Sequence, residues 1–165
     1  MSTDGQKADF LASFDAYSDA IFRFCLVKVS NRELAEDMTQ EVFMRYWQSL
    51  SKGQEMTNTR AFLYTVANNM AKDWYKKKKS VSLENELDTG WEPSDKSMDT
   101  EKTAEYREII DKLDDLEEKD REVMILRYVD GLEPKEIAVI LDETANNISV
   151  RINRATARLK AKLNL

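Results

Sequence analysis

Apolar residues recur every three or four positions along most of this chain, and residues that interrupt helices are rare. The 165 residues include only four glycines and two prolines, and 34% are charged. Apolar side chains spaced in this way share one face of an α-helix, whereas a half-buried strand needs strict alternation. The sequence therefore predicts an all-α protein, and its length suffices for one ordinary domain or two small ones.

The C-terminal stretch 120–163 has the clearest helix boundaries. Its first helical pattern ends at Gly131, because glycine commonly follows the last residue of a helix. Pro134 then suits the first turn of a short second helix, where its missing N–H is not needed. A polar break over 142–146 follows, with Thr144 as the expected N-cap of a long last helix.

The last helix of this stretch has two different faces. Its apolar positions recur at steps of three and four and predict one buried stripe: Ile148, Ile152, Ala155, Leu159 and Leu163. A basic and amide-rich stripe lies beside it, and no acidic residue occurs from Thr144 onward. A short helix, a tight turn and such a second helix are typical of a helix-turn-helix, in which arginines hold phosphates and asparagines reach base edges, adenine best. An ordinary amphipathic helix with a solvated basic face is the alternative.

The N-terminal half predicts three helices, over 8–29, 33–50 and 60–79, with a break at 30–31 and a loop over 51–59. The apolar face expected of the first helix comprises Phe10, Leu11, Phe14, Tyr17, Ile21, Phe24 and either Val27 or Lys28. The apolar side expected of the third helix comprises Phe62, Leu63, Val66, Met70 and Trp74. Three helices with this much apolar surface can close a small core.

The third predicted helix ends in a strongly basic run. Residues 60–79 include six basic residues and one acidic residue. Trp74 and Tyr75 directly precede the last four lysines. Cations for phosphates, aromatic rings for stacking and upstream amides for base edges are the ingredients of a surface that binds single strands. The alternative is a lysine run that merely ends a solvated helix, where the helix dipole favours cations.

Residues 81–100 differ in character from the segments on either side. They carry one basic and six acidic residues, a net charge of −5, and contain a glycine and a proline. We interpret them as a flexible linker between a three-helix domain over 1–80 and a second domain over 101–165. The second domain is expected to open with a helix over 101–118 and so to contain four helices, the last two forming the helix-turn-helix.

The residue types that are missing limit the chemistry. The chain has no histidine and one cysteine, Cys25, which lies among apolar residues and is expected in the core. We therefore expect no enzyme activity, no metal and no cofactor. The N-terminus lacks a signal-peptide pattern and no apolar run has the length of a membrane span, so we expect a cytoplasmic protein without membrane insertion. The net charge of −6 does not exclude DNA binding, because contact depends on local patches.

Three segments follow each other along the chain: ELAEDMTQEVFMRYW (33–47), NTRAFLYTVANNMAKDWYKKKK (58–79) and LEEKDREVMILRYVDGLEPKEIAVIL (116–141). Together they resemble a bacterial RNA polymerase sigma factor of the extracytoplasmic-function group. The order and spacing of the segments carry the resemblance more than any one of them. It implies two helical domains joined by a flexible linker, and a factor that binds core RNA polymerase and directs promoter-specific transcription initiation.

In this resemblance, the second helix docks on the clamp coiled coil of the polymerase. Five of its residues share a face opposite the core stripe: Asp37, Gln40, Glu41, Met44 and Trp47. An exposed tryptophan beside a methionine and carboxylates is natural for an interface hot spot. The alternative is that Trp47 only covers the core.

The third helix resembles the reader of the minus-ten promoter element. Asn69 aligns with the asparagine that lines a pocket for a base flipped from the non-template strand, with Asn68 as the alternative contact. The loop over 51–59 would wall this pocket, and the acidic linker would enter the RNA-exit region of the polymerase. The expected minus-ten contacts are Arg60, Asn68, Asn69, Lys72, Trp74, Lys76, Lys77, Lys78 and Lys79.

The last helix resembles the reader of the minus-thirty-five element. The expected contacts are Asn146, Asn147, Ser149, Val150, Arg151, Asn153, Arg154 and Arg158. Three departures from the family pattern occur here, because Asp142 replaces a frequent glycine, Ser149 a frequent lysine and Val150 a commonly small or polar residue. Asp142 suits the turn if it adopts a left-handed conformation. The shortage of cations leaves open which minus-thirty-five sequence is read and how strongly.

The resemblance implies three partners: core RNA polymerase, promoter DNA and an anti-sigma factor. Two other hypotheses stand beside it. A stand-alone helix-turn-helix regulator would bind operator DNA without polymerase, but it would not explain the 37–47 face or the lysine-ended third helix. A helical protein–protein module without a DNA role would suit the acidic total, but not the tail that lacks acids.

Overall fold

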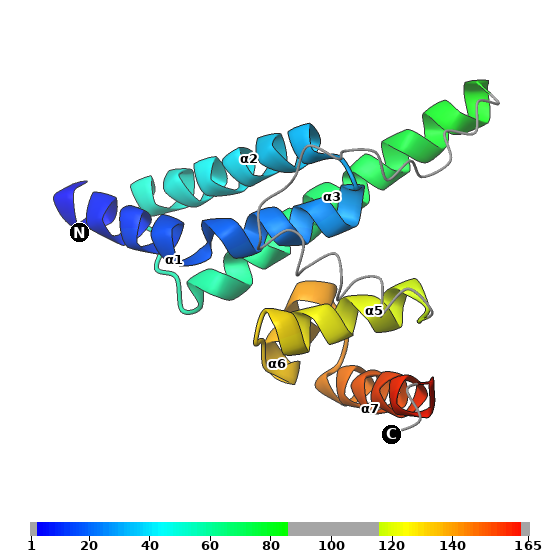
Figure 1. Cartoon of the computed structure of the whole chain (residues 1–165). Helices are drawn as coiled ribbons and strands as arrows, with labels where there is room; N and C mark the ends of the chain where they lie inside the picture. The colour runs from blue at the N-terminus through cyan, green and yellow to red at the C-terminus, as the bar shows by residue number, and fades with distance from the viewer. Residues whose placement is uncertain (1–2, 86–115, 163–165) are drawn as a thin grey trace. The chain divides into compact units, whose positions relative to one another are not determined.

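The computed structural model describes residues 3–85 and 116–162 of the chain (Figure 1). The chain divides into two compact units, Met1–Ser94 and Asp95–Leu165, and each is described by itself. The described residues form helices and turns, without a strand. The prediction of an all-α protein is confirmed, while the helix expected over 101–118 lies almost wholly outside the described residues.

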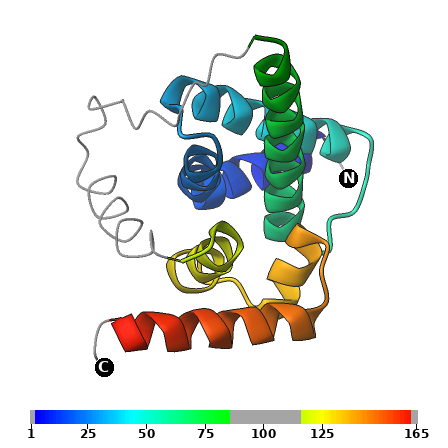
Figure 2. The same ribbon diagram turned by 90° about the vertical axis from the view of Figure 1, so that its right-hand side faces the viewer.

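The first unit is a bundle of α1 (Thr3–Val29), α2 (Arg32–Ser51) and α3 (Thr59–Asn85). Each of these helices packs against the other two (Figure 2). All three contribute to the core, whose buried side chains include Ile21, Phe24, Cys25, Val29, Ala35, Met38, Val42, Phe43, Tyr46, Leu50, Leu63 and Tyr64. None of the helices in the described part of the chain is long and apolar enough to cross a membrane.

The end of α1 and the starts of α2 and α3 lie within one residue of the predicted positions, whereas α1 begins at Thr3, five residues before the predicted start. Ser30 has a left-handed backbone, with φ of 53°, and turns the chain after α1. Asn31 then caps α2, since its Oδ1 accepts the N–H of Leu34 at 3.0 Å. Asn58 Oδ1 accepts the N–H of Ala61 at 3.0 Å in the same way at the start of α3. Each side chain satisfies a backbone donor that the first helical turn leaves without a partner.

Two predictions about α3 were wrong. The helix runs to Asn85, five residues into the segment predicted as linker, because no glycine or proline interrupts it before Gly90. Its buried stripe also differs from the predicted one, because Phe62, Val66, Met70 and Trp74 are only half-buried. Small side chains let helices approach closely, and a search for large apolar residues misses such a face. The stripe that packs inward comprises Ala61, Leu63, Tyr64, Ala67, Asn68 and Ala71.

The second unit contains α5 (Glu118–Met124), a π-helical turn (Ile125–Val129), α6 (Pro134–Leu141) and α7 (Ala145–Lys162). Both α5 and α6 pack on α7 (Figure 2). Their buried side chains include Val123, Leu126, Leu132, Ile137, Ile140, Ile148, Ile152 and Ala155. The predicted inward stripe of the last helix is thus confirmed at Ile148, Ile152 and Ala155, whereas Leu159 is half-buried. Together, α6, the turn and α7 form the predicted helix-turn-helix.

The turns of this unit follow the predicted chemistry. Gly131 has φ of 72° and lets the chain leave the first helical segment. Pro134 is the first residue of α6. Thr144 caps α7, because its Oγ1 accepts the N–H of Asn147 at 3.1 Å. One detail differs, since the segment before Gly131 ends in a π-helical turn closed by the bond from Asp130 N–H to the Ile125 carbonyl at 3.1 Å.

Cys25 is the small core residue that the sequence predicts. It is fully buried, and burial raises the pKa of its thiol from 9.0 to about 12, although a hydrogen bond with Thr39 acts in the opposite direction. The nucleophilic thiolate is therefore absent at neutral pH. Cys25 acts in the folded chain as an apolar packing group.

Asp142 ends α6 in the left-handed conformation, with φ of 54° and ψ of 50°, as its place in the turn requires. A side chain in this conformation crowds its own backbone, which costs about 1 kcal/mol that glycine avoids. We predict that Asp142→Gly raises the free energy of unfolding by about 0.5–1 kcal/mol. Asp142→Ala should lower it, because alanine keeps the steric cost and loses the polar side chain. Urea unfolding followed by circular dichroism measures both, and a destabilised glycine variant would contradict the prediction.

Candidate functional site

The residues predicted to dock on polymerase lie along one face of α2. Asp37, Gln40 and Met44 are exposed, and Met44 keeps 56% of its surface. Glu41 is half-buried and pairs with Arg45 at 3.1 Å. An exposed methionine surrounded by acids and amides is the composition expected of this face.

Trp47 is half-buried, which corrects the prediction of an exposed ring. Its ring centroid lies 5.5 Å from that of Phe10 of α1, in an edge-to-face arrangement. Phe10 also stacks on Phe14 at 6.2 Å. Trp47 therefore covers the core and at the same time borders the exposed face of α2, so each of the two interpretations describes part of its surroundings.

Two apolar residues of α1 extend this face, and the sequence assigned both to the core. Leu11 is 59% exposed and Phe14 is 42% exposed. The ring of Phe14 lies 5.0 Å from that of Phe43 on α2, so the two helices share the surface. The sequence does contain a signal for this exposure, because the apolar face of α1 is wider than one buried stripe requires. We name the α1–α2 surface by its members: Leu11, Phe14, Asp37, Gln40, Glu41, Met44 and Trp47.

Asn68 and Asn69 lie in opposite surroundings on α3. Asn68 is 1% exposed and belongs to the core stripe, whereas Asn69 is exposed. An amide buried in a packed core makes its hydrogen bonds inside the protein and cannot reach a DNA base. The alternative that Asn68 contacts the base is therefore corrected, and Asn69 is the one of the two that nucleic acid can meet.

The basic end of α3 is exposed and carries an ordered aromatic pair. Its exposed lysines are Lys72, Lys76, Lys77, Lys78 and Lys79. The ammonium of Lys78 lies 4.8 Å from the ring centroid of Trp74, and Trp74 meets Tyr75 edge to face at 4.9 Å. The Tyr75 hydroxyl donates to a backbone carbonyl of α1, which ties this end of α3 to the bundle. Arg60, at the start of the helix, is half-buried.

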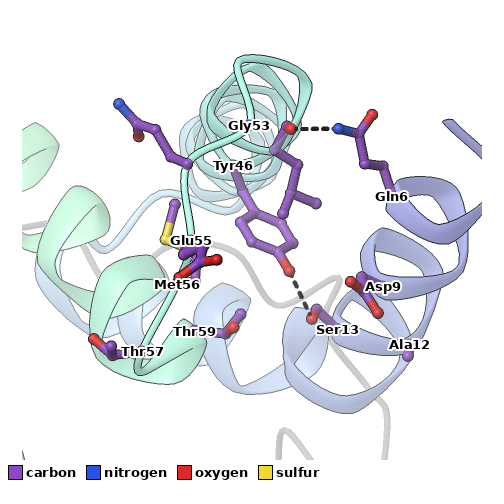
Figure 3. A pocket seen from close by; sticks show the side chains of 12 residues that line it. Gln6, Asp9, Ala12, Ser13, Tyr46, Gly53, Glu55, Met56, Thr57 and Thr59 are labelled. Carbon is purple, nitrogen blue, oxygen red and sulfur yellow. Dashed lines mark hydrogen bonds between the residues drawn. The ribbon is translucent and has the colours of Figure 1, made fainter. Parts of the chain in front are cut away.

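The loop between α2 and α3 walls a cavity of about 570 Å³ (Figure 3). On its α1 side, the hydroxyls of Ser13 and Tyr46 share a hydrogen bond of 3.1 Å. Its charged lining residues, Asp9 and Glu55, are both acidic, which disfavours a phosphate. Asn69 does not line this cavity, so it is not the pocket expected around that residue.

The outer face of α7 carries uncharged side chains. Asn146, Asn147, Val150 and Asn153 are exposed, and Val150 keeps 54% of its surface. Ser149 is half-buried. Because residues three and four apart are neighbours on a helix, Asn146, Val150 and Asn153 form one line along α7. We call these three residues the outer line.

Each of the three arginines of α7 forms an ion pair with an acidic side chain. Arg154 Nη2 and Arg158 Nη1 donate to the two carboxylate oxygens of Asp120 on α5, at 3.1 and 3.4 Å. The Asp120 side chain is 1% exposed, whereas each of the two arginines is 51% exposed. Arg151 Nη1 donates to Glu143 at 3.0 Å, and the Arg151 side chain is only 17% exposed. Arg154 and Arg158 thus remain accessible to a phosphate, while Arg151 does not lie at the surface as predicted.

Within residues 3–85 and 116–162, no group of three or more cysteine, aspartate and glutamate side chains is arranged to hold a metal ion. The surfaces that the described residues present are an apolar and acidic one on α1 and α2, an amide and lysine one on α3, and an amide and arginine one on α7. Their chemistry matches a protein partner for the first and nucleic acid for the other two.

The ion pairs of Asp120 generate a prediction about stability. Asp120→Asn keeps the shape but loses the charge-assisted hydrogen bonds, which are worth about 1.5–3 kcal/mol. The double change Arg154→Ala and Arg158→Ala should cost more, about 3–5 kcal/mol, because it leaves a buried carboxylate without its partners. Chemical unfolding of the three proteins measures the order. Equal losses, or a larger loss for Asp120→Asn, would contradict it.

Two family descriptions match the chain in sequence. The family described as Sigma-70 region 2 matches residues 14–81, and the family described as Sigma-70, region 4 matches residues 106–159. The first match contains α2 and most of α1 and α3, and the second contains α5, α6 and most of α7. The two regions together cover most of the chain.

Curated relatives match over nearly their whole length. The ECF RNA polymerase sigma factor SigW of Bacillus subtilis is 29% identical over 96% of this chain and 91% of its own. SigM of the same organism, also described as an ECF RNA polymerase sigma factor, is 28% identical over 92% of this chain and 93% of its own. EcfG of Rhodopseudomonas palustris is 27% identical over 98% of this chain and 86% of its own.

Solved structures share the fold. The sigma factor RpoE from Bartonella quintana, in complex with the anti-sigma factor NepR, superposes with a TM-score of 0.69 at 22% identity, over 95% of this chain and 98% of that chain. CnrH, in complex with the cytosolic domain of CnrY, gives 0.67 at 20% identity, over 96% and 89%. With both Sigma-70 regions present in order, the chain belongs to the sigma-70 family of RNA polymerase sigma factors, in its extracytoplasmic-function (ECF) group.

Proposed function

We propose that this ECF sigma factor meets core RNA polymerase with its α1–α2 surface, the melted minus-ten strand with α3, and the minus-thirty-five duplex with α7. An ECF sigma factor binds core polymerase and directs promoter-specific initiation, and this chain has that function. The assignment of surfaces rests above all on α3, where the exposed Asn69 is followed by a run of exposed lysines. The first domain then extends through Asn85, with the rest of the acidic segment as linker.

The α1–α2 surface suits a large protein partner. Met44, Leu11 and Phe14 expose apolar area that water does not favour, and Asp37 and Gln40 form a polar rim beside it. Apolar anchors ringed by polar residues are the usual anatomy of an interface hot spot. Trp47 is half-buried beside this surface, and its ring packs edge to face on Phe10 of α1. We propose that the clamp of the polymerase covers this surface.

On α3, a base reader and phosphate holders follow each other along one helix. The amide of Asn69 can donate to and accept from the Watson–Crick edge of a base that has left the stack. Lys72 and Lys76–Lys79 supply cations for the backbone of the same strand. Lys78 covers one face of Trp74 and so helps to fix that ring. Binding of the unstacked strand would supply the energy for melting, without ATP.

We propose a separate anti-sigma protein as a further partner. The similar structures of RpoE and CnrH are complexes, the first with an anti-sigma factor and the second with the cytosolic domain of CnrY. Exposed apolar side chains such as Met44 and Leu11 favour the binding of a protein that covers them whenever polymerase is absent. We also propose that the protein acts in the cytoplasm, where bacterial polymerase works, and catalyses no reaction of its own.

The polymerase assignment predicts a selective loss of affinity. Met44→Ala should weaken binding to bacterial core polymerase about tenfold or more, because it truncates an apolar anchor. Glu36→Ala is the matched control, since Glu36 is exposed on α2 beside Asp37 but pairs with Arg32 at 3.1 Å outside the proposed surface. Fluorescence anisotropy of labelled protein titrated with core polymerase measures both. Equal affinities for the two variants would reject the α2 assignment.

The minus-ten assignment predicts a defect after polymerase binding. Asn69→Ala should bind core polymerase normally but lower promoter-specific transcription roughly five- to 150-fold, the range of one lost base contact. Asp73→Asn changes another exposed residue of α3. It should not lower transcription, because the change only removes a charge that repels phosphates. Reconstituted transcription on a promoter library, with transcripts sequenced, gives the readout. A wild-type protein that binds DNA but not polymerase would favour the stand-alone regulator instead.

A further inference from the structure

The outer line of α7 points to the bases that this sigma factor reads. We propose that its minus-thirty-five element presents a thymine methyl group to Val150, between A·T pairs whose adenines face Asn146 and Asn153. The inference rests on the proposed function, in which α7 enters the major groove of the minus-thirty-five duplex.

The first step is that the arginines of α7, which could recognise guanine, are engaged in ion pairs within the protein. Bidentate contact from arginine or lysine is the commonest way to recognise guanine. Arg151 is mostly buried against Glu143, and the guanidiniums of Arg154 and Arg158 are both bonded to Asp120 on α5. No lysine occurs on α7 before Lys160, near the opposite end of the helix. The end of α7 where base contacts concentrate therefore lacks a cation aimed at base edges.

The second step is the spacing of the outer line. Asn153 follows Asn146 by seven positions, which is about 10 Å along a helix. Base pairs follow each other at about 3.4 Å, so the line spans roughly three of them. Val150 lies between the two asparagines and keeps 54% of its surface exposed. The three side chains can thus meet three neighbouring base pairs, with the apolar group in the middle.

The third step is the chemistry of each base edge. Val150 offers only methyl groups, and the one apolar group in the major groove is the C5-methyl of thymine. A G·C pair at this position would set its polar edge against the valine and lose hydrogen bonds to water without replacement. The amides of Asn146 and Asn153 can donate and accept together, which matches N7 and N6 of adenine. The line as a whole therefore selects A·T pairs.

The experiment removes the methyl group alone. Holoenzyme is assembled from the full chain and bacterial core polymerase, and its preferred minus-thirty-five element is selected from a library with a fixed minus-ten element. Each thymine of the selected duplex is then replaced by deoxyuridine, and promoter affinity is measured. At one thymine the wild type should lose about fourfold, the value of one buried methyl group, while Val150→Ala should lose less than about twofold.

Matched variants separate a contact from a loss of structure. Val139→Ala truncates another valine, 64% exposed on α6, and should respond to deoxyuridine as the wild type does. Val150→Thr keeps the shape and one methyl group, and it should keep part of the response if the fold is intact. A selected element made of G·C pairs, or an equal response of wild type and Val150→Ala at every thymine, would overturn the inference while leaving the sigma function in place. A wild-type holoenzyme that initiates on no promoter would overturn both.

Discussion

The buried carboxylate of Asp120 decides how α7 is seated in the second unit. A charge that is 1% exposed must find partners, and it finds them in two arginines one turn apart on α7. Both guanidiniums reach toward α5, and these ion pairs favour the rotation of α7 that places them there. The stripe of Ile148, Ile152 and Ala155 then faces the core, and the outer line faces away. One ion-paired group thus helps to set both the packing of the unit and the surface that it presents.

The sequence predicted the parts of this architecture that local chemistry controls. Helix starts and ends follow from capping side chains such as Asn31 and Thr144, and from left-handed residues such as Gly131 and Asp142. These signals act within a few residues, so they can be read without a structure. The regular apolar spacing of α7 was sufficient to predict which of its faces packs inward, because the whole pattern lies within one helix.

What the sequence did not predict depends on partners that are distant in the chain. The inward face of α3 consists largely of alanines with Tyr64 and Asn68, and only the closeness of α1 and α2 makes that face the buried one. Phe14 looked like a core residue because its pattern is apolar, but 42% of its surface is exposed in the folded bundle. The arginines of α7 looked like free cations because Asp120 precedes Arg154 by more than thirty residues. Apart from the late end of α3, which depends on its local sequence, these differences depend on how the elements pack on one another.

The pairing of arginines with acids also affects how the second unit competes for DNA. A cation that binds phosphate releases condensed counterions, and this release supplies most of the affinity for arbitrary sequences. On α7, Arg154 and Arg158 share the single charge of Asp120 and Arg151 is offset by Glu143, so the arginines and their acids leave one net positive charge, and the lysines of α7 lie in its last turn. If α7 enters the major groove as proposed, we expect its N-terminal end, where no cation is left without an acid, to gain little from random genomic DNA. Its residence on a promoter depends instead on the match of base edges and on the polymerase that brings it there.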